Sequence, residues 1–275
     1  MMITIVVLFL LIGLLAGIIG SLVGMGGGMF FVPALLYVVN HFYPGEMTPQ
    51  LAAGTSLFVI VVTALSSSVT YLKQKKVDIQ SALLFFIGSA PGAITGVYLN
   101  KLFDSHTFSL VFGLFQLAMF VLMMVKDKLK PRHVEWEVKR TYVDESGTTH
   151  TYGYSRWLSI LLAFLVGNVS SLFGVGGGIL MVPVMLILFR FPPHMATATS
   201  MCVIFLSSLV GSITNIMHHQ VAWLYVFALA PGALVGGVLG AKIASRLKGR
   251  TLVFLLRILI LAIAVQMITE YFIYR

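Results

Sequence analysis

Residues 21–33 of the chain read SLVGMGGGMFFVP, and residues 171–183 read SLFGVGGGILMVP. A serine, a leucine, four glycines and a Val-Pro pair recur between them at a constant offset of 150 residues, from 21 to 171. We call residues 24–28 and 174–178 the first and second glycine stretches. Each interrupts a long apolar segment, where consecutive glycines weaken a helix. The chain is therefore expected to be organised around two similar breaks.

The composition is that of a membrane protein. Hydrophobic residues make up 59% of the 275 residues and charged residues only 10%, and the mean hydropathy is +0.98. Soluble domains carry about 25% charged residues. Apolar runs of about 20 residues, enough to cross a bilayer as a helix, recur along the chain.

Ten apolar runs fall into two groups of five, separated by a polar linker. Further motifs repeat between the groups: an AxxTS motif from residues 52 and 196, an APGAxxG motif from residues 90 and 230, and a glutamine at 116 and 266. We therefore predict a duplicated transmembrane unit, with a first repeat in 1–125, a linker in 126–155 and a second repeat in 156–275. The runs are expected at about 3–23, 28–40, 51–72, 79–100, 106–125, 157–173, 178–190, 196–217, 222–241 and 251–272.

The positions of the basic residues predict the topology. If all ten runs cross the membrane, Lys101 and Arg275 are the only loop or terminal cations on one side, Arg257 lies within a run, and the rest of the 18 Lys and Arg residues lie on the other side. If the short second and seventh runs only dip into the membrane, the division is more even. The positive-inside rule favours ten crossings, with both termini outside and the linker in the cytoplasm. Five spans per unit then invert one repeat relative to the other.

The linker is predicted to form a small β-hairpin. Residues 134–138 and 148–154 alternate in character around Asp-Glu-Ser-Gly at 144–147. A disordered connector is the alternative.

The glycine stretches are expected to line a route through the membrane. Run two has 13 residues, so as a helix it rises only about 20 Å, against a hydrocarbon core of about 30 Å. Irregular backbone at this depth is tolerated only against protein or a water-filled cavity. Helices that start at Gly28 and Gly178 would direct free N–H groups and positive dipole ends inward, which suits an anion. The alternative is that the glycines only allow helices to cross closely.

Hydroxyl and amide side chains near the breaks complete the predicted site. Hydroxyls can donate hydrogen bonds to an oxyanion, although helix capping or interhelical bonding is an equal alternative. The two glutamines either face the substrate or pair with another helix. The residues predicted to bind the anion are Ser21, Gly24, Gly26, Gly27, Gly28, Thr55, Ser56, Gln116, Ser171, Gly174, Gly176, Gly177, Gly178, Thr199, Ser200 and Gln266.

Other function classes lack their motifs. The nine carboxylates lie in loops or near the ends of runs, so a membrane-centre carboxylate relay is not expected. The GMGGG sequence lacks the lysine of a P-loop, and neither a metal cluster nor a nucleophile constellation appears. We therefore expect neither an enzyme nor a cofactor. Nucleic acid is not an expected partner, because the basic residues gather in the short polar loops.

These motifs resemble the TauE/SafE family of sulfite exporters, also called TSUP permeases. GMGGGMFFVP, GVGGGILMVP, the two Thr-Ser pairs and the APGAxxG segments carry the resemblance, which covers nearly the whole chain. It implies a carrier in a bacterial inner membrane for small sulfur-containing anions, such as sulfite, sulfoacetate and other organosulfonates, in either direction. A passive anion channel and a non-transporting scaffold or assembly factor are the alternatives; the oligomeric state stays open.

Overall fold

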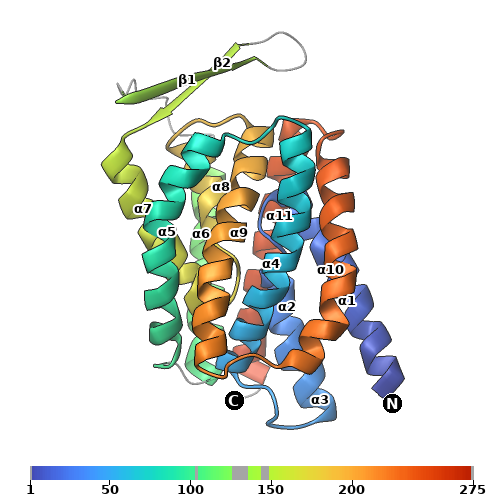
Figure 1. Ribbon diagram of the computed structural model, residues 1–275. Helices are drawn as coiled ribbons and strands as arrows, with labels where there is room; N and C mark the ends of the chain where they lie inside the picture. The colour runs from blue at the N-terminus through green and yellow to red at the C-terminus, as the bar shows by residue number, and fades with distance from the viewer. Residues whose placement is uncertain (1, 103–104, 126–135, 144–148, 274–275) are drawn as a thin grey trace.

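The computed structural model describes residues 2–102, 105–125, 136–143 and 149–273. These residues form a bundle of helices with a two-stranded hairpin at one end (Figure 1). The helices and strands are α1 (Met2–Val23), α2 (Gly28–Ala34), the π-helical turn η1 (Leu35–Val39), α3 (Asn40–Phe42), α4 (Pro49–Lys73), α5 (Ile79–Asn100), α6 (Ser105–Val125), β1 (Val138–Val143), β2 (Thr149–Tyr154), α7 (Arg156–Phe173), α8 (Gly178–Ile187), α9 (Pro193–Met217), α10 (Trp223–Ala244) and α11 (Gly249–Ile273).

The helices coincide with the predicted apolar runs, and their starts carry the expected signals. The Thr48 side chain accepts a hydrogen bond from the Leu51 N–H at the start of α4, and Asp78 does the same for the Ser81 N–H at the start of α5. Within the described residues, seven helices are long and apolar enough to cross a membrane, and two apolar helices, 28–42 and 178–187, are shorter. The short second and seventh segments therefore follow the glycine stretches as predicted.

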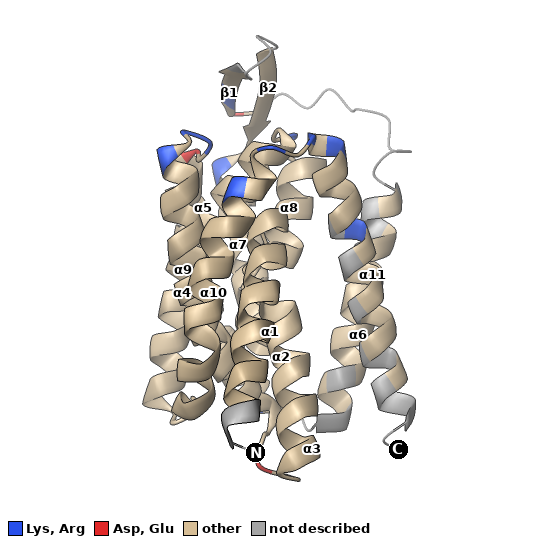
Figure 2. Ribbon diagram, turned by 90° about the vertical axis from the view of Figure 1, so that its right-hand side faces the viewer, with Lys and Arg blue, Asp and Glu red and all other residues tan. Residues whose placement is uncertain are grey.

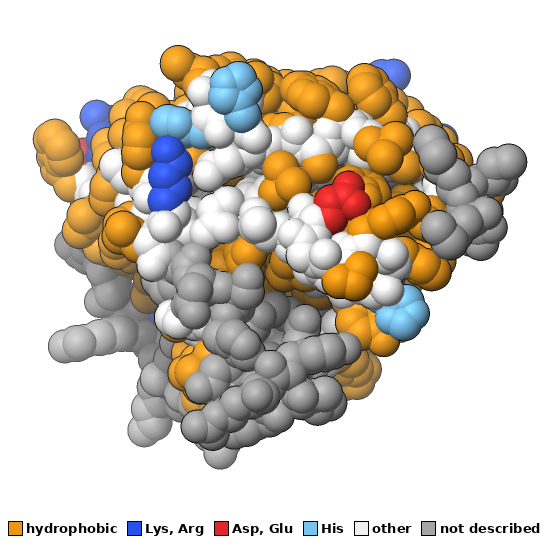
Figure 3. All heavy atoms as spheres, turned by 90° about the horizontal axis from the view of Figure 1, so that it is seen from below, with side chains coloured by type: hydrophobic (Ala, Val, Ile, Leu, Met, Phe, Trp, Pro, Cys, Tyr) orange, Lys and Arg blue, Asp and Glu red, His pale blue; other side chains and the backbone are white. Residues whose placement is uncertain are grey.

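The charged residues divide the bundle into two ends. Most of the described Lys and Arg residues gather at the hairpin end, whereas α1 begins and α11 ends at the opposite end (Figure 2), where Lys101 caps α5. Seen from that opposite end, most described side chains are hydrophobic or uncharged (Figure 3). The asymmetry of charge expected from the sequence is thus present in the fold.

Small residues let the helices of the two halves pack closely. Helix α1 lies along α10, and α5 lies along α7, while α4 packs on α9 and α6 on α11. A Cβ atom on Gly232 would clash with the backbone carbonyl of Leu10, and one on Gly92 would clash with that of Phe164. The contacts repeat at an offset of 144 residues along these helices: Gly88 faces the carbonyl of Ile160 as Gly232 faces that of Leu10, and Gly92 faces that of Phe164 as Gly236 faces that of Leu14. The two repeats are therefore joined by matching contacts, one helical turn away from the alignment of the APGAxxG motifs.

The hairpin is present, but its first strand lies later than predicted. Strand β1 pairs antiparallel with β2 in a register that sets Val138 opposite Tyr154 and Val143 opposite Thr149. Of the predicted first strand, 134–138, the described residues 136 and 137 precede β1 and only Val138 lies within it, whereas the predicted second strand, 148–154, coincides with β2 over its described residues. Alternation alone did not locate the strand, because contacts of Arg140 and Tyr152 with the helix bundle fix the register. Residues 144–148 of the predicted turn lie outside the described residues.

Replacing either motif glycine should loosen the bundle. We expect Gly92→Val and Gly232→Val each to destabilise the protein by about 2 kcal/mol, because the new side chain meets backbone that cannot move aside. The measurement is thermal unfolding in detergent, with the lipid-facing Ile94→Val variant as control. Unchanged unfolding of both glycine variants would contradict the close packing.

Candidate functional site

Both glycine stretches adopt backbone conformations that only glycine takes without strain. Helix α1 ends at Val23, and φ is +83° at Gly24, +74° at Gly26 and +89° at Gly27 before α2 begins. The second stretch repeats the pattern, with +69°, +79° and +65° at Gly174, Gly176 and Gly177. Positive φ at three nearby positions turns the chain from one helix into the next. The predicted breaks are therefore tight, ordered turns.

The two stretches lie against each other with little between them. A Cβ atom on Gly28 would lie 2.7 Å from the carbonyl oxygen of Gly174 and 2.8 Å from the carbonyl carbon of Val175. A Cβ atom on Gly178 would clash with the carbonyl oxygen of Gly24 and with Met25. Each helix start thus faces the turn of the other half, and the stretches run past each other in opposite directions.

Two isoleucines fill the centre between the stretches. A Cβ atom on Gly26 would lie 3.0 Å from the Ile60 side chain and 3.3 Å from that of Ile204. On Gly176 it would lie 2.9 Å and 3.3 Å from the same side chains. Ile60 lies about 17 Å along α4, a helix of about 37 Å, so this contact is near mid-depth. Both isoleucines are buried, and neither belongs to a motif that the sequence pattern indicated.

The serines next to these isoleucines join the two halves by crossed hydrogen bonds. Ser56 on α4 donates to the carbonyl oxygen of Gly174 at 2.7 Å, and Ser200 on α9 donates to that of Gly24 at 2.8 Å. Each hydroxyl has one proton to donate, and that of Ser200 has a second acceptor in its own helix, the carbonyl of Thr197 at 2.9 Å. In this arrangement the predicted anion ligands Ser56 and Ser200 therefore hold the turns, and they bind an anion only if these bonds open.

The neighbouring threonines hold the ends of other helices. Thr55 accepts a hydrogen bond from the N–H of Ala222 at 2.9 Å, just before α10. Thr199 accepts one from the N–H of Asp78 at 3.0 Å, just before α5. Because each hydroxyl acts as the acceptor, its proton remains available for another acceptor.

Several backbone N–H groups of the stretches are already used. Met25 and Gly26 donate to the carbonyl of Gly20 at 2.7 Å and 3.2 Å, and Gly178 donates to Gly176 at 2.7 Å. Among the described residues, the N–H groups of Gly27 and Gly177 find no backbone acceptor. These unpaired donors lie at the starts of α2 and α8, where the positive ends of the helix dipoles add to their attraction for an anion.

The remaining predicted ligands lie around the two turns. Ser21 donates to the carbonyl of Gly237 at 2.8 Å, whereas the buried Ser171 hydroxyl has no partner among the described residues. Gln116 is fully buried, and neither of its amide atoms is hydrogen-bonded there. Gln266 instead lines a cavity of about 300 Å³ between α1, α2 and α11. The repeated glutamines therefore have different surroundings.

Sequence reasoning missed a buried carboxylate under the hairpin. The Asp78 side chain accepts hydrogen bonds from Tyr152 at 2.8 Å and Ser81 at 2.6 Å, and Arg140 pairs with it at 3.0 Å. Tyr154 in turn hydrogen-bonds Ser81 at 2.7 Å. Burial, the Asp78 charge and the hydrogen bond to it all raise the pKa of Tyr152 above its ordinary value, so this hydroxyl remains a proton donor at neutral pH. The helical N-cap position of Asp78 was the available signal.

The contact of the hairpin with Asp78 links the hairpin to Thr199 but not to its counterpart Thr55. Asp78 is bonded through its own N–H to Thr199, which directly precedes Ser200. The residue equivalent to Asp78 in the second half is Ala222, which has no side-chain charge. The hairpin therefore stabilises the Thr199 side of the site, and the Thr55 side has no comparable carboxylate contact through Ala222.

Removing the cation should release the hairpin. We expect amide hydrogens of 138–143 and 149–154 in Arg140→Ala to exchange roughly tenfold faster, because a charge-assisted bond to a buried carboxylate is lost. Hydrogen exchange with mass spectrometry measures this effect. Arg156→Ala serves as control, since its pair with Glu137 at 3.3 Å is exposed on both sides. Equal exchange in all three proteins would show that the pair of Arg140 with Asp78 does not hold the hairpin.

Comparison with known proteins agrees with this architecture. Residues 9–267 match the family model described as "Sulfite exporter TauE/SafE". The chain is 46% identical over 267 residues to the "Probable membrane transporter protein YunE" of Bacillus subtilis (strain 168), covering 96% of this chain and 97% of that protein. It is 30% identical over 237 residues to a "Probable membrane transporter protein" of Xylella fastidiosa (strain Temecula1 / ATCC 700964), covering 86% and 83%. No solved structure matches it significantly. The resemblance seen in the glycine motifs is confirmed: the chain belongs to the TauE/SafE family of membrane transporters.

Proposed function

We propose that the chain is a secondary transporter of small sulfur-containing anions, such as sulfite, sulfoacetate or other organosulfonates, in a bacterial inner membrane. The observation that carries the proposal is the meeting of the two glycine stretches near mid-depth, with the starts of α2 and α8 facing the same centre. The family description, which names sulfite export, supports the substrate class. The relatives' names support transport rather than catalysis or scaffolding.

The chemistry of the centre suits an oxyanion. The N–H groups of Gly27 and Gly177 have no backbone acceptor among the described residues; in this arrangement Gly27 lies against Gly20 of α1 and Gly177 beside Ser170 of α7, so they reach a shared anion only after these helices move. The absence of side chains lets an oxyanion approach the backbone closely. The protons of Thr55 and Thr199 are available from the flanking helices. A tetrahedral or pyramidal oxyanion presents several acceptor oxygens, so it can accept bonds from both stretches at once.

The proposed topology is two inverted units with ten membrane segments. The pairing of α1 with α10 matches that of α7 with α5, and the bond from Ser56 to Gly174 matches that from Ser200 to Gly24. We place the basic hairpin end in the cytoplasm by the positive-inside rule, with both termini outside.

Alternating access would then open one crossed bond at a time. Separation of Ser200 from Gly24 exposes the centre toward the hairpin end, and separation of Ser56 from Gly174 exposes it toward the other end. Ile60 and Ile204 fill the centre in the present arrangement, which favours a carrier over a continuously open channel. The contact of Asp78 with Thr199 favours closure at the hairpin end.

Purified protein in liposomes tests the proposal directly. We expect saturable uptake of radiolabelled sulfite and faster exchange when unlabelled sulfite is present on the opposite side, because a carrier returns more quickly when loaded. A panel of organosulfonates then defines the substrate. Absence of transport of any anion in the panel would refute the proposal, and single-channel currents without counterflow would assign a channel instead.

Deleting the hairpin separates transport from scaffolding. We expect removal of residues 134–153 to lower sulfite exchange without abolishing it, because Asp78 loses its contacts with Arg140 and Tyr152 while the glycine stretches keep theirs. Complete loss of exchange in a correctly inserted, stable deletion variant would contradict a merely stabilising role of the hairpin.

The central isoleucines should control leakage. In Ile60→Ala and Ile204→Ala we expect passive sulfite efflux to rise about tenfold, since each change removes side-chain volume from the contact between the stretches. Stopped-flow efflux from loaded liposomes measures it, and Ile213→Ala, which is lipid-facing on α9, is the control. Equal efflux from all variants would mean that the route does not pass these side chains.

A further inference from the structure

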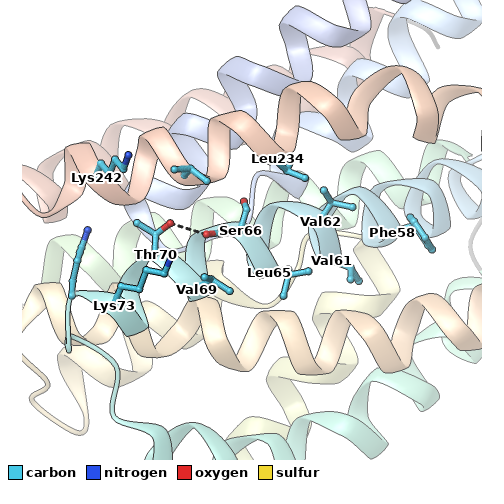
Figure 4. Close-up of a pocket in the computed structure, with 12 residues that line it drawn as sticks. Phe58, Val61, Val62, Leu65, Ser66, Val69, Thr70, Lys73, Leu234 and Lys242 are labelled. Carbon is cyan, nitrogen blue, oxygen red and sulfur yellow. Dashed lines mark hydrogen bonds between the residues drawn. The ribbon is translucent and has the colours of Figure 1, made fainter.

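A long apolar groove runs between α4 and α10, away from the glycine stretches (Figure 4). Its volume is about 710 Å³, and its lining is mainly hydrophobic. Phe58 lies at one end, and Lys73 and Lys242 lie together at the other. Val69 and Leu234 line its length, and both project from the exposed surface of their helices.

A glycine lets the two helices that form the groove approach each other closely. Gly237 of α10 has no side chain, and a Cβ atom there would clash with the Ser66 hydroxyl of α4. Both hydroxyls in the lining are satisfied within their own helix: Ser66 donates to the carbonyl of Thr63 at 3.0 Å, and Thr70 donates to that of Ser66 at 2.8 Å. Gln74, at the lysine end, keeps a buried Oε1 without a partner among the described residues. Between its two ends, the lining therefore offers an occupant an apolar surface.

The two lysines give one end of the groove a positive charge. Lys73 and Lys242 lie in the last turns of α4 and α10, and both are exposed. Neither forms an ion pair with a carboxylate within the described part of the chain. The equivalent positions on α9 and α5 carry Met217 and Tyr98, so a pair of lysines at these two positions occurs on α4 and α10 but not on their counterparts.

The groove is long enough to hold a lipid acyl chain. From Phe58 to Lys73 the helix rises about 22 Å, whereas one leaflet contributes about 15 Å of hydrocarbon thickness. A free anion would leave the apolar lining uncovered, and a neutral lipid would leave both lysines without a counter-charge. A molecule with an acyl chain and an anionic headgroup satisfies both ends.

We propose that this groove binds an anionic phospholipid from the leaflet at the basic end of the bundle. The phosphate lies between Lys73 and Lys242, and one acyl chain follows Val69 and Leu65 toward Phe58. Phosphatidylglycerol is the probe, because its headgroup carries one negative charge and no cation. The assignment depends on the membrane location and is independent of the substrate that the protein moves.

Native mass spectrometry of the full chain with phosphatidylglycerol or phosphatidylcholine tests the assignment. We expect wild type to retain phosphatidylglycerol preferentially. In the Lys73→Gln/Lys242→Gln variant this preference should fall about tenfold, because each lysine contributes attraction for an anionic headgroup. Lys75→Gln/Lys248→Gln removes the same charge from neighbouring loops and should keep the preference. Val69→Trp fills the groove and should reduce phosphatidylglycerol binding although both lysines remain.

Four results would overturn the proposal. Equal retention of the two lipids by wild type would show that the headgroup is not recognised. Equal loss of preference in both double variants would assign it to the general charge of this end. Unchanged binding by Val69→Trp would place the acyl chain elsewhere. Displacement of the lipid by millimolar inorganic phosphate would assign the lysines to a free anion.

Discussion

The fold depends on the direct approach of two backbone segments near the middle of the bundle. Gly28 faces the carbonyl of Gly174, and Gly178 faces that of Gly24, at separations that leave no space for a Cβ atom. Polar backbone at membrane depth is stable only where protein or water satisfies it. Here some backbone N–H groups of each turn bond to carbonyls nearby in sequence, and one carbonyl of each turn accepts a hydrogen bond from a serine of the opposite half. Neither half therefore forms its centre alone.

The two halves make matching hydrogen bonds around the centre, but the bonds at the hairpin end are supported by additional contacts. Ser56 with Thr55 and Ser200 with Thr199 make the same bonds to opposite halves. Only the Thr199 side continues through Asp78 to a cation and two tyrosines of the hairpin. Because the Asp78 contact adds to the closure formed by Ser200 and Gly24, we expect the resting protein to be closed at the hairpin end.

Much of the fold could be predicted from the sequence, because hydropathy and glycine spacing are local signals. The helix bounds, the short segments after the glycine stretches and the presence of a hairpin followed from them. The position of β1 did not, because Arg140 and Tyr152 fix it through contacts distant in sequence. For the site, repetition identified the glycines and the Thr-Ser pairs, but not the serine partners. Ile60 and Ile204 look like any other membrane isoleucine until the fold brings them together.

The most direct test of a central route asks whether the contact between the two isoleucines must open. Both side chains reach the same points beside Gly26 and Gly176, so Ile60→Cys/Ile204→Cys in a Cys202→Ala background places two thiols together. The account predicts that oxidation to the disulfide stops sulfite exchange in liposomes and that a reducing agent restores it. Full exchange by the quantitatively cross-linked protein would contradict a route between the glycine stretches.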